Sequence, residues 1–215
     1  MNYRNQQQPD PLKKQSEVSL ADMGQGLSPM SPPEAYSPPA ENPVDYNSLH
    51  PFLKNLMIEH TEFKDKILIL KEVLQSSTEK NALDSLEIFL GHFNQEVIPH
   101  NRREESKLFV LLNERLLQNG EHSQTKEKIT GIKILKDDHN HAFELGSNIS
   151  SLLETMPLLK DQPSRKILLC EILKITNELT QLLELHIFRE DQIVFGLAQK
   201  LLTKPELDEI HSDFI

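Results

Sequence analysis

Hydrophobic residues recur along most of this chain at alternating steps of three and four positions, the spacing of one face of an α-helix. No stretch alternates hydrophobic and polar residues as a half-buried strand would. Four long helices joined by short connections favour an all-α, antiparallel, up-down-up-down four-helix bundle. At Thr203 a Thr-x-x-Glu sequence resembles a capping box and predicts a fifth, short helix. The four long helices are expected at residues 51–75, 79–118, 123–155 and 163–201.

Composition divides the chain into three parts. Eight of the 13 prolines lie in the first 43 residues. Such a segment cannot bury enough apolar surface to offset its ordering entropy, so residues 1–47 are expected to form a disordered tail. Its proline pairs could alternatively bind a protein partner. The bundle is assigned to residues 48–202, and a short C-terminal helix or tail to residues 203–215.

Polar side chains interrupt each predicted hydrophobic stripe. Every stripe contains one histidine where an aliphatic residue is expected, and the second and fourth stripes contain a glutamate four residues later. A buried carboxylate without a partner is very costly, and a buried imidazole needs hydrogen bonds. One such histidine is usually a satisfied core residue, but four of them with two matched glutamates need a common cause. The six residues are His60, His100, Glu104, His139, His186 and Glu190.

Counting residues places these six side chains in one zone of the bundle. With a rise of about 1.5 Å per residue, the four histidines lie roughly 24 to 34 Å from the bundle end that carries the first helix connection. The two members of a His-x-x-x-Glu pair lie on one helix face, one turn apart. Imidazole and carboxylate donors suit iron, manganese or zinc better than copper(I) or calcium. The sequence therefore predicts one or two metal ions between the helices.

Two stretches of the chain share a skeleton. PHNRREESKLFVLL (99–112) and LHIFREDQIVFGLA (185–198) both contain His-x-x-Arg-Glu-acid-x-x-aliphatic-Phe-x-Leu. Acid–histidine pairs occur in IEHTEF and DDHNHAF. In order and spacing these motifs resemble the hemerythrin-like, or HHE cation-binding, domain family over about residues 48–201. Carried over by position, the resemblance implies a non-haem di-iron centre in which His60 and His100 bind one iron, His139 and His186 bind the other, and Glu104 and Glu190 bridge them.

The chain also departs from that family's pattern. Oxygen-carrying hemerythrins have a second histidine one turn after the ligand of the third helix, and here that position is Phe143. Neither a five-histidine site nor reversible oxygen carriage therefore follows from the resemblance.

Neighbouring residues offer alternatives to this ligand set. His92 and Glu96 repeat the four-residue spacing but lie beside the stripe, so His92 is an off-face candidate for a fifth ligand. Asp191 could replace Glu190 if the fourth helix were rotated. Otherwise Glu105 and Asp191 are expected to face solvent or to support the ligands from behind.

Several further residues carry a structural expectation. Pro99 should kink the second helix, because it removes a backbone donor. Gly146 should leave space on the site face, either for a small ligand or for close helix packing. Arg103 and Arg189 should pair with acids on neighbouring helices. His141 should face away from the site, and the histidines expected at the surface are His50, His122 and His211.

Composition narrows the choice of function. The formal net charge of −10 and the sequence pI of about 5.4 argue against nucleic-acid binding. Cys170 is the only cysteine, which excludes an internal disulfide and a cysteine-built metal site and fits a reducing compartment. With neither a signal-like N-terminus nor a long uncharged apolar run, the chain is expected to be cytoplasmic and not inserted in a membrane.

Three functions remain open from the sequence. The first is an iron protein that binds or senses O2, NO or peroxide, or stores iron, with zinc or manganese as alternative metals. The second is a di-iron redox enzyme that reduces NO or peroxide or repairs iron–sulfur clusters. Repair proteins of this family usually carry a cysteine-containing N-terminal domain, and this chain has no cysteine there. The third is a metal-free helical interaction protein. No catalytic base or nucleophile beyond the ligands is assigned.

Overall fold

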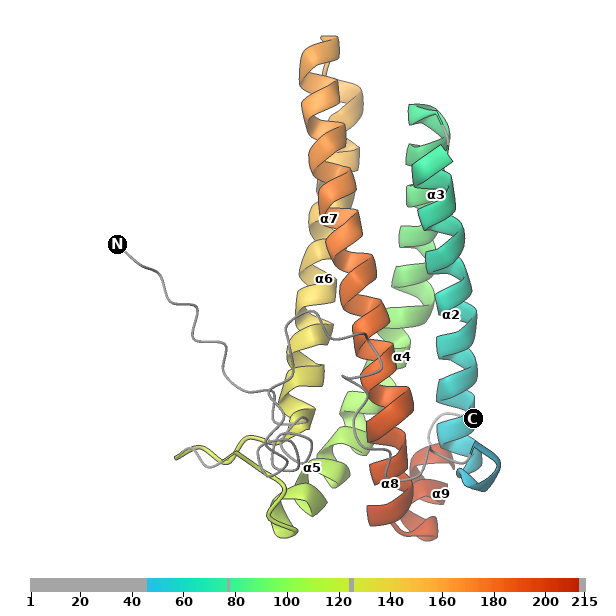
Figure 1. Ribbon diagram of the computed structural model, residues 1–215, viewed down its shortest axis with the longest axis vertical. Coiled ribbons are helices and arrows are strands. Elements are labelled where there is room, and N and C mark those ends of the chain that lie inside the picture. The colour runs from blue at the N-terminus through green and yellow to red at the C-terminus, as the bar shows by residue number, and fades with distance from the viewer. Residues whose placement is uncertain (1–45, 77, 124–125, 213–215) are drawn as a thin grey trace, which may run out of the picture.

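In the computed structural model, which describes residues 46–76, 78–123 and 126–212, the chain is all-helical and no β-strand occurs within these ranges. Figure 1 shows the long helices running side by side along the longest axis of the molecule. Residues 1–45 of the predicted tail lie outside the described residues, and Tyr46 and Asn47, which were also assigned to it, belong to a short 3-10 helix. The elements are η3 (Tyr46–Ser48), α2 (Pro51–Ser76), α3 (Glu79–His92), η4 (Phe93–Val97), α4 (Ile98–Arg103), η5 (Glu104–Leu108), α5 (Phe109–Gln118), α6 (Gly131–Thr155), η6 (Met156–Leu158), α7 (Gln162–Arg189), η7 (Glu190–Val194), α8 (Phe195–Leu201) and α9 (Lys204–Ser212).

Capping side chains explain where the helices begin. The Thr78 side chain accepts a hydrogen bond from the backbone N–H of Asn81, and Asp161 does the same for Ser164. The capping box predicted at Thr203 forms: its N–H donates to Glu206, whose own N–H donates back to the Thr203 hydroxyl. The short helix α9 follows as expected.

The third long helix begins later than predicted. It was expected near Ser123, but α6 begins at Gly131, because Thr130 caps it by accepting from the backbone N–H of Ile132. The Thr130 hydroxyl also donates to the Asn113 side chain at 2.6 Å, which ties this helix start to α5. Before it, Gly120 adopts a positive φ of 76°, a conformation that ends α5 and that glycine adopts without strain.

Three π-helical turns interrupt the second and fourth helical stretches. Of these, η5 begins at Glu104 and η7 at Glu190, and in each the first residue's carbonyl accepts from a phenylalanine N–H five residues later. The third, η4, directly precedes α4, near the kink predicted at Pro99; here Ile98 N–H bonds to the carbonyl of Phe93. A π turn inserts an extra residue, so the buried face after it moves on by one position.

The core consists of two apolar clusters. One lies around α5, α8, α9 and the start of α2, and the other around α3, α7 and the later part of α2. The predicted site residues of the first three long helical stretches fall between the two clusters, as His60 does between Leu56 and Phe63. On the fourth stretch Glu190 falls between Ile187 of one cluster and Val194 of the other. The six predicted site residues are therefore enclosed above and below by hydrophobic side chains.

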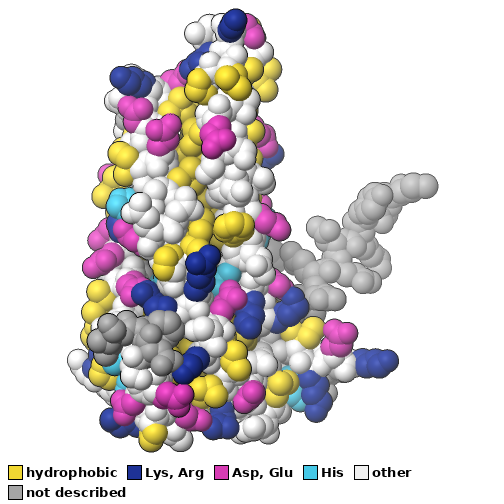
Figure 2. Space-filling view, turned by 180° about the vertical axis from the view of Figure 1, so that it is seen from behind, with side chains coloured by type: hydrophobic (Ala, Val, Ile, Leu, Met, Phe, Trp, Pro, Cys, Tyr) yellow, Lys and Arg dark blue, Asp and Glu magenta, His cyan; other side chains and the backbone are white. Residues whose placement is uncertain are grey.

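Charged side chains of both signs are interspersed on the face shown in Figure 2, beside a strip of hydrophobic side chains. None of the helices within the described ranges is long and apolar enough to cross a lipid bilayer.

Candidate metal centre

The structure brings all six predicted residues together in the interior. The two glutamates are fully buried, and each histidine is between 4% and 6% exposed. Their potential ligand atoms form two groups, and within each group all of these atoms lie within 4.8 Å of one another. The groups share both glutamates: one is His60, His100, Glu104 and Glu190, and the other is Glu104, His139, His186 and Glu190.

The histidines meet in two pairs through their Nε2 atoms. His60 Nε2 and His100 Nε2 are 2.9 Å apart, and His139 Nε2 and His186 Nε2 are 3.0 Å apart. Glu190 Oε2 lies 3.2 Å from the Nε2 atoms of both His60 and His186. Four imidazole nitrogens therefore point toward the two buried carboxylates.

Each histidine also contacts an acid through its outer nitrogen, Nδ1. His60 Nδ1 is 2.7 Å from Asp191, His100 Nδ1 is 2.7 Å from Glu59, and His139 Nδ1 is 2.6 Å from Glu105. His186 Nδ1 is 3.5 Å from Asp138, which is a charge contact rather than a hydrogen bond.

These four contacts form a closed ring around the helices. Glu59 on α2 supports the histidine of α4, Glu105 on η5 supports that of α6, and Asp138 on α6 supports that of α7. Asp191 on η7 returns to His60 on α2. Glu59 and Asp138, which each precede a histidine in the sequence, therefore support the histidine of the next helical stretch and not their own neighbour.

Three of these acids also form an ion pair with a basic side chain. Arg103 donates to Glu59, and Arg189 donates to Asp138 at 2.7 Å, so both arginines pair with acids of neighbouring helices as predicted. Lys64 donates to Asp191 at 3.0 Å. Asp191 thus takes the supporting role that the sequence left open, and Glu190, not Asp191, faces the histidines.

The ring of acids selects one tautomer of each neutral histidine that it contacts by a hydrogen bond. A carboxylate can only accept a hydrogen bond, so a neutral His60, His100 or His139 carries its proton on Nδ1 and presents a bare Nε2 lone pair to the interior. The carboxylate oxygens of Glu104 and Glu190 have no hydrogen-bond partner. Lone pairs and carboxylates that face one another at this depth repel and are costly unless a cation lies between them.

The pKa shifts follow from the same charge balance. Burial alone lowers the pKa of His100, but Glu104 and Glu59 outweigh it and raise that pKa to about 10. Burial likewise lowers the pKa of His186, and Glu190 and Asp138 raise it to about 10. For Glu190, burial raises the pKa, but His186 and His60 hold it well below its ordinary value. The centre therefore attracts positive charge strongly.

The donor set fits a metal cation. Four inward imidazole nitrogens and two shared carboxylates are the ligands that iron, manganese and zinc prefer. Histidines backed by carboxylates at the outer nitrogen are the usual arrangement around protein-bound metals. The cluster could hold one metal in each group, with Glu104 and Glu190 common to both.

Phenylalanines stack on two of the rings. Phe195 lies 5.5 Å from His60 with an interplanar angle of 16°, and Phe109 lies 5.7 Å from His139 at 17°. Both belong to the repeated sequence motif, in which they follow the glutamate by five residues. The repeat therefore supplies a histidine, a glutamate, a supporting acid, an arginine and a stacking ring to each half of the centre.

The alternative residues lie outside the cluster. His92 is partly exposed, contacts Glu96 at 2.7 Å and belongs to neither group of potential ligands. His141 faces outward, as expected, and contacts Glu178. The hydrophobic spacing of the third long helix predicts that Phe143 is buried four residues after His139, and this is wrong: Phe143 is 56% exposed, and Ala142 is the buried residue one turn after His139.

Two further expectations are decided by packing. His50 was expected at the surface but is buried, because its Nε2 lies 2.9 Å from Asp208 of α9 and its Nδ1 accepts from Phe52 N–H. Gly146 serves close packing: a Cβ there would lie 2.8 Å from the ring of Phe93.

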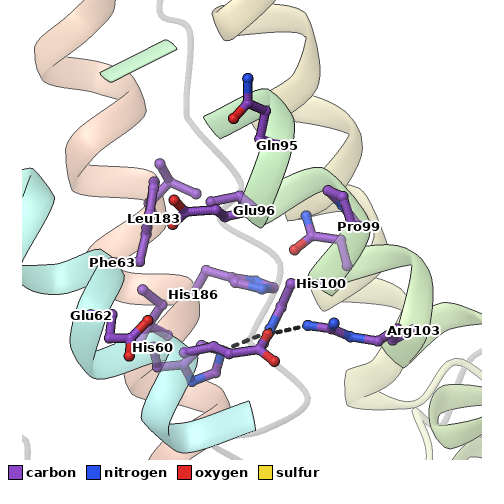
Figure 3. A pocket seen from close by; sticks show the side chains of 14 residues that line it. His60, Glu62, Phe63, Gln95, Glu96, Pro99, His100, Arg103, Leu183 and His186 are labelled. Atoms are coloured by element: carbon purple, nitrogen blue, oxygen red, sulfur yellow. Dashed lines mark hydrogen bonds and ion pairs between the residues drawn. The ribbon is translucent and has the colours of Figure 1, made fainter. Parts of the chain in front are cut away.

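A cavity of about 240 Å³ opens beside one half of the centre. Figure 3 shows His60, His100 and His186 on its wall, with Glu62 of α2 and Arg103 of α4 also around it. Its apolar wall includes Phe63, Val97 and Leu183. The exposed Glu62 and the buried His60 line the same cavity, so it connects the surface with the predicted site residues. No pattern in the sequence indicated this opening.

Comparison with known proteins agrees with this geometry. The family model for the hemerythrin HHE cation binding domain matches residues 51–198. Searches of curated proteins and of solved structures found no significant match. Because the matched segment covers well over half of the chain and contains all six residues of the cluster, the chain belongs to the hemerythrin HHE cation-binding domain family.

Proposed function

We propose that this protein binds two non-haem iron ions, one in each group of the cluster, and uses them to bind or sense O2, NO or peroxide, or to store iron. The observation that carries the proposal is the pair of fully buried carboxylates of Glu104 and Glu190, which have no hydrogen-bond partner and lie between four histidines. Such a cluster is costly to bury in a metal-free protein. We infer that the four long helical stretches form an antiparallel up-down-up-down bundle around it.

The chain's own residues prepare the site. The supporting acids hold the Nδ1 protons and so aim the Nε2 lone pairs inward, which lowers the cost of organising the ligands. The two apolar clusters exclude water from both ends of the site. When bound, iron would supply an electron-donating centre with an open position for a small molecule.

Metal content is the direct test. Protein produced in iron-supplemented medium should contain close to two irons per chain by elemental analysis. His100→Ala and His186→Ala should each lose most of that iron, because each removes a ligand from a different group. His122→Ala should keep it, because His122 contacts the Ser123 carbonyl and belongs to neither group. Equal metal content in all three variants would refute the assignment.

One observation favours the alternative of a di-iron redox enzyme. The cavity of about 240 Å³ beside His60 and His100 is far larger than the roughly 10–15 Å³ that one water molecule needs. A small substrate could therefore reach the centre. Steady turnover of NO or peroxide by iron-loaded protein would establish this alternative, and stoichiometric binding without turnover would exclude it. If purified protein holds no metal and iron does not raise its melting temperature, the metal-free interaction protein is the better assignment.

A further inference from the structure

We propose that the cavity between α2 and the η4–α4 segment is the route by which a divalent cation enters the centre, and that Glu62 captures the ion at its mouth. This inference rests on the proposed function, because it concerns how the metal reaches the ligands. Glu62 is exposed and lines the cavity, whereas His60, two residues earlier, is buried in its wall. The two residues therefore mark the outer and inner ends of one path.

The cavity leads to the ligands, whereas hydrophobic side chains close the centre above and below. His60, His100 and His186 line it, and all three belong to the buried groups. The same buried groups include the oxygens of Glu104 and Glu190, which have no hydrogen-bond partner. Above and below the centre, the two apolar clusters would offer a hydrated ion no ligand in place of its water.

The charges on the cavity wall select a cation. Three carboxylates line it, those of Glu59, Glu62 and Glu96, against the single guanidinium of Arg103. Arg103 pairs with Glu59, and Lys66 pairs with Glu96. Glu62 has no ion pair or hydrogen bond within the described part of the chain, so it is the wall carboxylate with its charge uncompensated.

An uncompensated carboxylate at a cavity mouth has a definite effect on rate. A cleft lined by one sign of charge raises the local concentration of the opposite ion and its association rate, by a factor of about 10 to 1,000 for a whole site. Carboxylate oxygens also bind hard divalent cations directly and can replace one of their waters. Glu62 should therefore speed uptake without belonging to the final ligand set.

Stopped-flow uptake of Co²⁺ by full-length, metal-free protein tests the proposal, because bound Co²⁺ is visible by its absorption. Glu62→Gln should load about three- to tenfold more slowly than the unchanged protein, and Glu62→Lys more slowly still, with the same final stoichiometry. Added salt should slow the unchanged protein more than Glu62→Gln. Glu154→Gln, the same change at an exposed acid of α6 outside the cavity, should load at the unchanged rate.

Each other outcome overturns the proposal in a recognisable way. If Glu62→Gln and the unchanged protein take up Co²⁺ at equal rates and to the same final amount, the proposed entry route is wrong, but the proposed function is not affected. A lower final stoichiometry in Glu62→Gln would make Glu62 a ligand of the bound metal. An unchanged rate with altered azide binding to the loaded protein would assign the cavity to a ligand of the metal. No Co²⁺ uptake by any of these proteins would overturn the proposed function and the route with it.

Discussion

At the scale of single residues, the centre is organised by acids that need not touch the metal. Glu59, Glu105, Asp138 and Asp191 each come from a helix other than that of the histidine they support. Every histidine is thus held at one nitrogen by a neighbouring helix, and the other nitrogen faces the interior. Positioning of the ligands and docking of the helices therefore depend on the same contacts.

Asp191→Asn should weaken metal binding while leaving the ligand set complete. The substitution replaces the carboxylate that holds His60 Nδ1 at 2.7 Å with a neutral amide, so His60 becomes a poorer donor and is less well oriented. Loss of such a supporting partner typically costs about 10- to 100-fold in metal affinity. Titration against a competing chelator measures the change.

Asp137→Asn is the matched control. Asp137 is exposed and pairs with Lys133 on its own helix, away from the histidines. Its substitution should leave affinity unchanged. If both variants bind metal as tightly as the parent, the ring of acids does not position the ligands.

The sequence indicated the six buried polar residues, but it did not indicate which acid contacts which histidine. The six residues were detectable because polar side chains on an apolar stripe are costly and call for a partner. Glu59 and Asp138 were seen only as parts of acid–histidine pairs, since which histidine an acid contacts depends on how the helices face one another. His50 was misplaced for the same reason, because its partner Asp208 lies far along the chain.

At the scale of helices, the π turns decide which residues face the core. After Glu104 the simple helical period places Leu108 and Leu111 inside. Leu108 is buried, but Leu111 is only partly buried, and Phe109 and Leu112 are fully buried instead. After Glu190 the same helical period predicts that Ile193 is buried, but the buried residues are Val194 and Phe195. The extra residue of η5 and η7 turns Phe109 and Phe195 inward, so that they stack on His139 and His60.

Substitution of the packed glycine tests the contact between η4 and α6. In Gly146→Ala the new methyl group would meet the buried Phe93 ring at 2.8 Å. Overpacking of this kind costs about 1–3 kcal/mol, and the better helix propensity of alanine returns up to about 1 kcal/mol. The free energy of unfolding, measured by urea denaturation, should fall by about 1–2 kcal/mol.

Gly91→Ala provides the comparison within α3. A Cβ at Gly91 has nothing within 4 Å. The same substitution should therefore raise the free energy of unfolding by about 0.5–1 kcal/mol, through the reduced entropy of the unfolded chain. A stabilising Gly146→Ala would show that Phe93 and α6 are not in close contact.

At the scale of the whole molecule, the chain is built from two halves that contribute equivalent residues. His60 corresponds to His139, and the motif that begins at His100 corresponds to the one that begins at His186. Each half gives its glutamate to both groups, so neither group is complete without the other half. This explains why the motif occurs twice in one chain.

Metal binding should therefore stabilise the whole fold. At a free metal concentration 100-fold above the dissociation constant, a ligand that binds only the folded state adds about 2.7 kcal/mol. For a chain of this size that corresponds to a rise in melting temperature of roughly 5–10 °C. Calorimetry with and without a chelator measures the shift.

The variants His122→Ala and His186→Ala show whether metal bound at the cluster causes this stabilisation. His122→Ala should retain the metal-dependent shift in melting temperature, and His186→Ala should lose most of it, because only His186 belongs to the cluster. A shift of equal size in both would mean that the metal stabilises the protein from another place.

The sequence alone determined the helical class, the number of long helices and the six polar residues on their buried faces, because hydrophobic period and the cost of burying charge are local properties that can be read along the chain. The tertiary structure decided which acid supports which histidine, that Ala142 rather than Phe143 faces the core, and that a cavity opens beside His60 and His100. These depend on the rotation of each helix about its axis. One inserted residue in a π turn changes that rotation by about 100°, and no local pattern records it.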